Sequence, residues 1–177
     1  MPTYVALLRG INVGGHKKVP MADLKKMMEK MGLKNVKTLL ASGNVVFDAI
    51  DGDTAKLTKK MEEQFTKTFG FSSSIILRSK GHIDTLLKAA PFKGIKVTPA
   101  TRLYVTFLSS PQKGTLTLPY QTPDKLFKIL SASATEVFSV ATVSPEGGTV
   151  EAMGILEKAF GKNVTTRNWN TVEKLVK

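Results

Sequence analysis

VKTLLASGNVVF, residues 36–47, predicts two short strands joined by a tight turn. β-Branched and aromatic residues favour strands on both sides, and Ser42 with Gly43 between the two apolar runs is a compact hairpin signal. The hairpin lies between two segments of helical periodicity. Its position therefore decides the order of the elements around it.

The segment before the hairpin predicts a strand, a loop and a helix. YVALLRGIN, residues 4–12, is the strand, and VGGHKK, residues 13–18, is the loop. Pro20 suits a first helical turn and opens a helix that ends near Gly32.

The segment after the hairpin predicts a second helix and a last strand. Asp53 can cap the helix, Gly70 ends it, and SSSIILR, residues 72–78, forms the strand. The first half therefore has the order β-α-β-β-α-β, which is the split βαβ arrangement of ferredoxin-like domains.

The second half predicts the same order again, with only a weak middle strand after the turn PEGG, followed by an extra C-terminal helix. Its predicted elements are the strands RLYVTFL (102–108), EVFSVATV (136–143) and VTTRN (164–168), the helices DKLFKIL (124–130) and AMGILEKAF (152–160), the turn PEGG (145–148), and a final helix with Asn170 and Glu173 as its capping box. We therefore expect an α+β fold of tandem ferredoxin-like repeats, residues 1–95 and 96–177. Because both faces of each predicted sheet are apolar, we expect the repeats to pack into one two-lobed body.

The composition is that of a folded protein with a basic surface. The 177 residues are 42% hydrophobic, and 26 Lys and Arg against 14 Asp and Glu give a formal charge of +12. With no Cys and two His, the sequence excludes a disulfide framework, a cysteine nucleophile and a His-rich zinc centre. It shows no signal peptide and no run of membrane length, so we expect a soluble cytoplasmic protein without a metal site or a membrane partner.

The positive charge favours polyanionic or phosphorylated partners. Its densest stretch, from Lys17 to Lys37, contains seven lysines and includes the first predicted helix. Two interpretations remain open, a solvated lysine face and a nucleic-acid stripe. The helix and its flanks carry no aromatic side chain that could stack on a base.

Three polar segments are candidates for a binding site: RGINVGGHKK (9–18), SGN (42–44) and TTRNWN (165–170). A right-handed β-α-β crossover makes the first two strands parallel, so the first two segments leave the sheet at the same edge. Their candidate ligand-binding residues are Arg9, Asn12, Gly14, Gly15, Lys17, Lys18, Ser42 and Asn44. Such charges, amides and backbone donors suit an anion. The alternative is that the glycines only permit a turn and Ser42 with Gly43 only closes the hairpin.

TTRNWN contributes Arg167, Asn168 and Asn170 as further candidates, because Arg grips a carboxylate or phosphate through two parallel hydrogen bonds. In the alternative interpretation, Trp169 docks into the core while Asn168 or Asn170 caps the last helix.

Catalytic motifs are absent from the sequence. The spacing of Gly10 and Gly15 matches a phosphate-binding P-loop, but His16 and Lys17 stand where Lys and Ser or Thr are required. His16 is the one credible proton carrier, whereas His82, beside Ile83, is expected to be structural. No residue pattern identifies a cofactor.

Three segments together resemble the bacterial domain-of-unknown-function 1697 family: YVALLRGINVGG with KVPM, VKTLLASGNVVF, and TTRNWNTVEKL. The resemblance spans nearly the whole chain in the right order. It implies a two-lobed α+β structure of repeated ferredoxin-like units and an uncharacterised activity, and it supplies no catalytic residues. The sequence departs from the family at SPEGGTVEAMG, residues 144–154, where members tend to have a Gly-rich, Arg-containing stretch.

These observations give three hypotheses of function. The first is a protein that binds a small anionic or phosphorylated ligand at the RGINVGGHKK edge. The alternative is a basic nucleic-acid-binding module without an enclosed pocket. The third is an enzyme that uses His16 as general acid or base.

Overall fold

The computed structural model describes residues 1–13, 15–50, 52–143 and 151–177. The fold is mixed α and β, with two antiparallel sheets. The chain divides into two compact units, residues 1–85 with 175–177, and residues 86–174. The division falls inside helix α3 (Lys80–Lys88), whereas the sequence places a boundary between residues 95 and 96.

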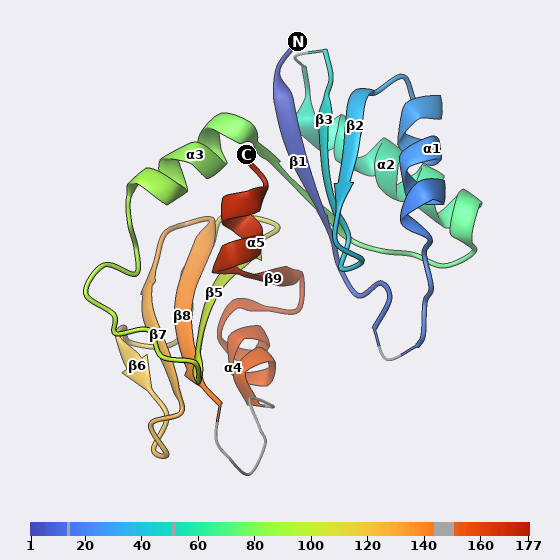
Figure 1. The fold of residues 1–177 in the computed structure, drawn as a ribbon. Helices are drawn as coiled ribbons and strands as arrows, with labels where there is room; N and C mark the ends of the chain where they lie inside the picture. The colour runs from blue at the N-terminus through green and yellow to red at the C-terminus, as the bar shows by residue number, and fades with distance from the viewer. Residues whose placement is uncertain (14, 51, 144–150) are drawn as a thin grey trace. The chain divides into compact units, whose positions relative to one another are not determined.

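The first unit contains a four-stranded sheet with helices on one face (Figure 1). Its elements are β1 (Thr3–Leu8), α1 (Met21–Lys30), β2 (Lys34–Leu39), β3 (Asn44–Asp48), α2 (Thr54–Phe69) and β4 (Ile75–Ser79). The strand order is β2-β3-β1-β4, and every neighbouring pair is antiparallel. The predicted order β-α-β-β-α-β is confirmed for this unit.

The helix ends of the first unit follow from their capping residues. The Asp53 carboxylate accepts hydrogen bonds from the backbone N–H of Ala55 and Lys56 at the start of α2. Gly70 ends the same helix with φ of 80°, a left-handed conformation that favours glycine. Both capping predictions are confirmed.

The core of the first unit lies between one sheet face and the helices α1 and α2. Tyr4, Ala6 and Leu8 point to this face from β1, because alternate residues of a strand share a face. Leu24 of α1 and Phe65 of α2 are fully buried against them. The apolar helix faces and the apolar strand face that the sequence periodicity predicts thus pack together in one core.

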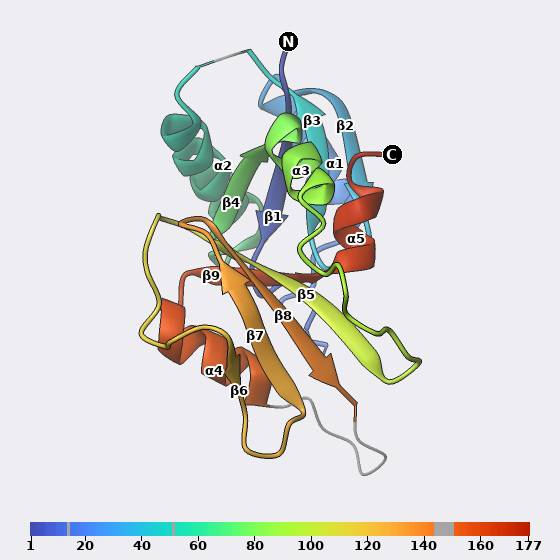
Figure 2. The same cartoon turned by 90° about the vertical axis from the view of Figure 1, so that its left-hand side faces the viewer.

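The second unit contains a five-stranded sheet (Figure 2). Its elements are β5 (Thr101–Leu108), β6 (Tyr120–Gln121), β7 (Phe127–Ala132), β8 (Glu136–Thr142), α4 (Glu151–Phe160), β9 (Val164–Asn168) and α5 (Trp169–Lys174). The strand order is β6-β7-β8-β5-β9. Leu156 and Phe160 of α4 pack on the sheet face that carries Leu108 and Val137.

The helix predicted over residues 124–130 is wrong, because this segment forms a turn and then β7. Thr122 and Asp124 close the turn, with the Asp124 carboxylate accepting from the Leu126 N–H at 2.9 Å. Phe127 and Ile129 are buried in alternation, as a strand requires. The second unit therefore does not repeat the element order of the first.

The predicted capping box of the last helix, Asn170 with Glu173, is wrong in its N-cap residue. Helix α5 begins at Trp169, so Asn170 lies inside the helix and is not its N-cap. The strand predicted over 164–168 is confirmed as β9, and Gly161 ends α4 with φ of 92°. The PEGG turn at 145–148 lies outside the described residues.

Candidate functional site

The loop after β1 and the turn between β2 and β3 meet at one end of the first sheet (Figure 1). The Asn12 side chain donates to the Ala41 carbonyl at 2.7 Å. The Leu8 N–H donates to the Gly43 carbonyl at 2.9 Å. The predicted shared edge is confirmed.

The amide of Asn12 braces the loop from inside. Its Nδ2 also donates to the Val19 carbonyl at 3.0 Å, and its Oδ1 accepts from the Val19 N–H at 2.7 Å. The backbone N–H of Asn12 donates to the Lys17 carbonyl at 3.0 Å and closes the loop. Both ends of the amide therefore bond within the protein, which favours a structural role.

Asn44 and Ser42 have a similar internal role in the hairpin turn. Asn44 is fully buried, and its Nδ2 donates to the Leu39 carbonyl at 2.8 Å and to Ser42 Oγ at 3.0 Å. Gly43 between them has φ of 90°, and an added Cβ would lie 2.8 Å from Ile11 Cδ1. These contacts favour the interpretation that SGN closes the hairpin.

The charged groups of the loop lie on its outside. Lys17 and Lys18 are exposed, and Lys17 Nζ lies 6.0 Å from the centre of the Phe71 ring. His16 is also exposed. Gly15 is exposed with φ of 77°, whereas Gly14 lies outside the described residues.

Arg9 is half-buried and holds the loop to the start of β4 through its backbone. Its N–H donates to the Ser74 carbonyl at 2.9 Å, and its carbonyl accepts from Ser73 Oγ at 2.8 Å. These bonds bring the segment after α2 to the same edge of the sheet.

Arg167 is buried inside the second unit. Its Nη1 donates to Thr165 Oγ1 at 2.7 Å and to the Thr166 carbonyl at 3.1 Å. Burial lowers the pKa of its guanidinium to about 10. The side chain is still charged at neutral pH, and its contacts favour the role of a brace.

An open cavity of about 280 Å³ lies where β5 begins and β9 ends. The side chains that line it are Val97, Thr101, Arg102, Leu103, Asn168, Trp169 and Asn170. Asn168 and Asn170, two of the candidates from TTRNWN, line the cavity, whereas Arg167 does not. The arginine that lines it is Arg102.

Arg102 is held in a fixed orientation at this cavity. Its Nη1 donates to the Pro99 carbonyl at 2.8 Å and to the Thr101 carbonyl at 3.1 Å. Nε and Nη2 donate to no other group in the described part of the chain. These two donors form a parallel pair that matches a carboxylate or a phosphate.

Other donors with unused hydrogen-bonding capacity line the same cavity. Among the described residues, the side chains of Asn168 and Asn170 and the indole N–H of Trp169 have no hydrogen-bond partner. The Trp169 ring is held edge-on against Phe92, with 5.0 Å between ring centres. The described residues that line the cavity include one Arg and no Asp or Glu, and this set suits an anion.

Sequence reasoning missed Arg102 because no motif surrounds it. It lies in a strand beside apolar residues, and it reaches the cavity through the pairing of β5 with β9, in which Tyr104 is opposite Asn168. That pairing joins segments far apart in the sequence. The Trp, Asn and Arg content of TTRNWN was the only signal that indicated this region.

A second cavity of about 220 Å³ in the first unit has a different character. Tyr4, Met31, Leu33 and Leu57 contribute apolar surface to it. Its carboxylate, Asp53, caps α2 and would repel an anion at this place. It is therefore the weaker candidate for an anionic ligand.

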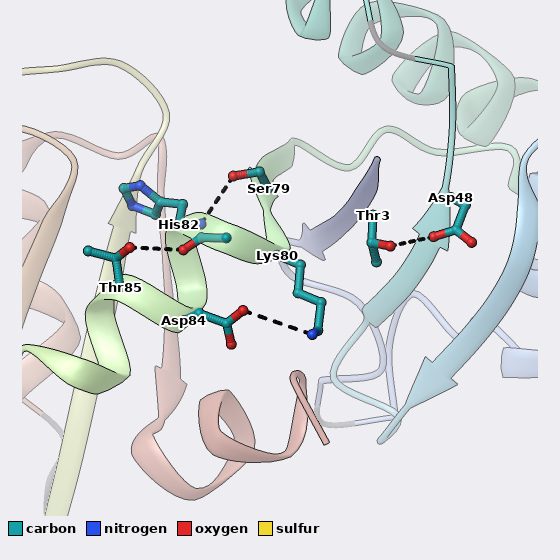
Figure 3. A network of polar contacts seen from close by, with 8 residues as sticks. Thr3, Asp48, Ser79, Lys80, His82, Asp84 and Thr85 are labelled. Atoms are coloured by element: carbon teal, nitrogen blue, oxygen red, sulfur yellow. Dashed lines mark hydrogen bonds and ion pairs between the residues drawn. The ribbon is translucent and has the colours of Figure 1, made fainter. Parts of the chain in front are cut away.

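The carboxylate of Asp48 belongs to a structural cluster. Thr3 Oγ1 donates to it at 2.5 Å (Figure 3), and Asn35 Nδ2 donates at 2.7 Å. The hydrogen bond from Thr3, followed by that from Asn35, lowers the pKa of Asp48 below its ordinary value. In the same view, Ser79 Oγ accepts from the His82 N–H at the start of α3.

The described ranges lack a cluster of metal-ligating side chains and a helix able to cross a membrane. Within 1–13, 15–50, 52–143 and 151–177, no three His, Asp or Glu side chains are grouped as metal ligands would be. None of the helices there combines the length and apolar character that a membrane crossing requires.

Comparison with known proteins places the chain in a family. A search of curated proteins found no match. Among solved structures, the conserved bacterial protein SP0830 from Streptococcus pneumoniae is similar in fold, with a TM-score of 0.72, 24% sequence identity, and coverage of 99% of this chain and 97% of that chain. The model of a family of proteins of unknown function, DUF1697, matches residues 1–138. The chain therefore belongs to the DUF1697 family.

Proposed function

We propose that this protein binds a small anionic or phosphorylated ligand, and that the cavity lined by Arg102, Asn168, Trp169 and Asn170 holds it. The sequence alone predicts such a ligand at the RGINVGGHKK edge. Two amides of that edge, those of Asn12 and Asn44, are engaged in internal hydrogen bonds. The cavity of the second unit offers unused donors instead.

The orientation of Arg102 is the observation that carries the proposal. Two carbonyls fix Nη1, so the Nε and Nη2 edge remains for a ligand and loses little freedom on binding. The amides of Asn168 and Asn170 can orient a bound oxyanion, and Trp169 supplies an aromatic wall. A cavity of 280 Å³ has room for about nine water molecules at roughly 30 Å³ each, which suits a small metabolite.

A thermal-shift screen tests the proposal. Phosphate, glycerol phosphate, ribose phosphate and succinate are compared with the uncharged parents glycerol and ribose. An anion that binds only the folded state raises the melting temperature. When its free concentration is about 100 times its Kd, it adds about 2.7 kcal/mol to the free energy of unfolding.

Two variants assign any shift to the cavity. Arg102→Gln should remove the shift, because it deletes the paired donors. Asn163→Ala is the matched control, since Asn163 is exposed in the same unit and does not line the cavity. A shift that survives in Arg102→Gln would reject this site, and uncharged parents that shift the protein equally would reject an anionic ligand.

A further inference from the structure

The edge of the first unit that carries the loop after β1 is rich in positive charge. Three segments of described residues form it: residues 9–19 without Gly14, residues 40–44 and residues 70–74. Their basic residues are Arg9, His16, Lys17 and Lys18, and none of the three segments contains Asp or Glu. We call this surface the basic edge.

Hydrogen bonds between the segments make the basic edge a fixed surface. Asn12 joins the first segment to the second through its bond to Ala41. Arg9 joins the first to the third through its backbone bonds to Ser73 and Ser74. The backbone that carries the basic side chains is therefore held in place before any partner arrives.

The accessible side chains of the basic edge are of two kinds. Lys17, Lys18 and His16 are exposed polar groups. Val13 and Leu40 are large apolar side chains that are 64% and 52% exposed. Positive charge beside apolar surface matches a chain of phosphates that alternate with sugars and bases.

We propose that the basic edge binds the phosphodiester backbone of a nucleic acid. Lys17 and Lys18 contact successive phosphates, and Val13 and Leu40 contact the sugars or bases between them. The net charge of +12 on the whole chain steers the polyanion toward the protein. This surface lies in a different unit from the proposed ligand cavity, and neither proposal depends on the other.

A nucleic acid fits this surface better than an anionic membrane does. Lipid-binding clusters typically contain about four to eight Lys or Arg, with large aromatic or leucine side chains that enter the bilayer boundary. The two exposed lysines and two aliphatic side chains of the basic edge fall short of that number. A few phosphate contacts, by contrast, are enough for measurable binding to a nucleic acid at low salt.

Fluorescence anisotropy with labelled oligo(dT) and oligo(rU) tests the proposal, and the two probes separate DNA from RNA. The variant is Lys17→Gln with Lys18→Gln. The control is Lys25→Gln with Lys26→Gln, which removes the same charge from exposed positions on α1. Each titration is repeated between about 50 and 200 mM salt.

We expect the wild type to bind at least one probe with an affinity that falls as salt rises. Because each phosphate contact contributes about 0.7 to the log–log salt slope for single strands, the loop variant should lose about 1.4 of that slope. It should also bind at least tenfold more weakly at low salt, whereas the control should change affinity less than about threefold.

Three results would overturn the proposal. One is the absence of binding by the wild type at low salt. Another is an equal loss in the loop variant and the α1 control, which would mean that the charge acts without a defined surface. The third is binding to phosphatidylglycerol vesicles that depends on Lys17 and Lys18, without binding to either oligonucleotide.

Discussion

The side-chain amide of Asn12 donates a 2.7 Å hydrogen bond to the backbone carbonyl of Ala41, and this bond ties the loop after β1 to the β2–β3 turn. Asn12 has φ of 54°, which places it in the left-handed region that Asn tolerates better than most residues. The residue thus supplies both the turn and the bonds that fix it.

Replacing Asn12 should therefore destabilise the first unit. Asn12→Ala removes three side-chain hydrogen bonds, leaves the N–H of buried Val19 without this acceptor, and places Ala at a positive φ. We expect a loss of about 2–3 kcal/mol in the free energy of unfolding, measured by urea denaturation. Asn12→Gly removes the same bonds without the backbone strain and should lose about 1 kcal/mol less. Equal stability of Asn12→Ala and the wild type would contradict the bracing role.

Gly43 should be far less tolerant of substitution than Gly15. Both have positive φ, 90° and 77°, so Ala is strained at either position by about 1 kcal/mol. At Gly43 a Cβ would also lie 2.8 Å from Ile11 Cδ1 and 2.9 Å from Leu8 Cβ, whereas at Gly15 nothing lies within 4 Å. Gly43→Ala should cost about 2–4 kcal/mol through overpacking, and Gly15→Ala about 1 kcal/mol.

The urea midpoints of both variants decide this comparison. Adding Ile11→Val to Gly43→Ala should recover part of the lost stability. Ile11→Val deletes Cδ1, the atom nearest to the added Cβ, whereas Leu8 Cβ remains in place. Similar midpoints for Gly43→Ala and Gly15→Ala would mean that the turn adjusts without contact with Ile11.

The lowered pKa of Asp48 should make the stability of the protein fall at acid pH. Hydrogen bonds from Thr3 and Asn35 lower the pKa of Asp48 in the folded protein, so the folded state favours the charged carboxylate. This contribution is complete above the unfolded pKa, near about 4, and is lost as pH falls through the lower folded value. Stability should therefore fall between about pH 5 and pH 2 in the wild type, and less steeply in Asp48→Asn.

Urea midpoints at pH 6 and at pH 3 measure the effect. Thr3→Val serves as a second variant, because it removes the donor with the largest influence on the pKa of Asp48 and should also flatten the profile. An acid slope in Asp48→Asn as steep as that of the wild type would contradict the assignment.

The elements of the first unit could be predicted because their signals are local. Asp53 and Gly70 mark the ends of α2 by their own chemistry, and Ser42 with Gly43 marks the hairpin. Crossover handedness then places the loop and the turn at one edge. None of these features had to be predicted from a contact between residues far apart in the chain.

In the second unit, the local sequence was compatible with both a helix and a strand at residues 126–130, and it gave no signal for Arg102. Leu126, Phe127 and Leu130 have helical spacing, but Phe127 and Ile129 also alternate, and a short apolar run does not distinguish the two. The pairing of β7 with β8 decides for the strand. Arg102 could not be predicted as a site residue, because only the pairing of β5 with β9 brings it to Asn168.

Arg167 should contribute far more than Arg102 to the stability of the ligand-free protein. Arg167→Ala truncates a buried side chain and removes the donor to Thr165 and Thr166, so we expect a loss of about 3 kcal/mol in stability. Arg102 is exposed at the cavity, and Arg102→Ala should stay within about 0.5 kcal/mol of the wild type. Thermal melts without ligand compare them, and an Arg167→Ala variant as stable as the wild type would return Arg167 to the list of ligand-binding candidates.

The intrinsic fluorescence of Trp169 tests the proposed ligand site most directly, because Trp169 is the single tryptophan of the chain and lines the cavity. Ribose phosphate, glycerol phosphate and succinate are titrated into the wild type, Arg102→Gln and the control Asn163→Ala. We expect a saturable change with at least one anion, a Kd at least tenfold weaker in Arg102→Gln, equivalent to about 1.4 kcal/mol, and an unchanged Kd in the control. No saturable change with any of these anions, or equal affinity of the wild type and Arg102→Gln, would contradict it.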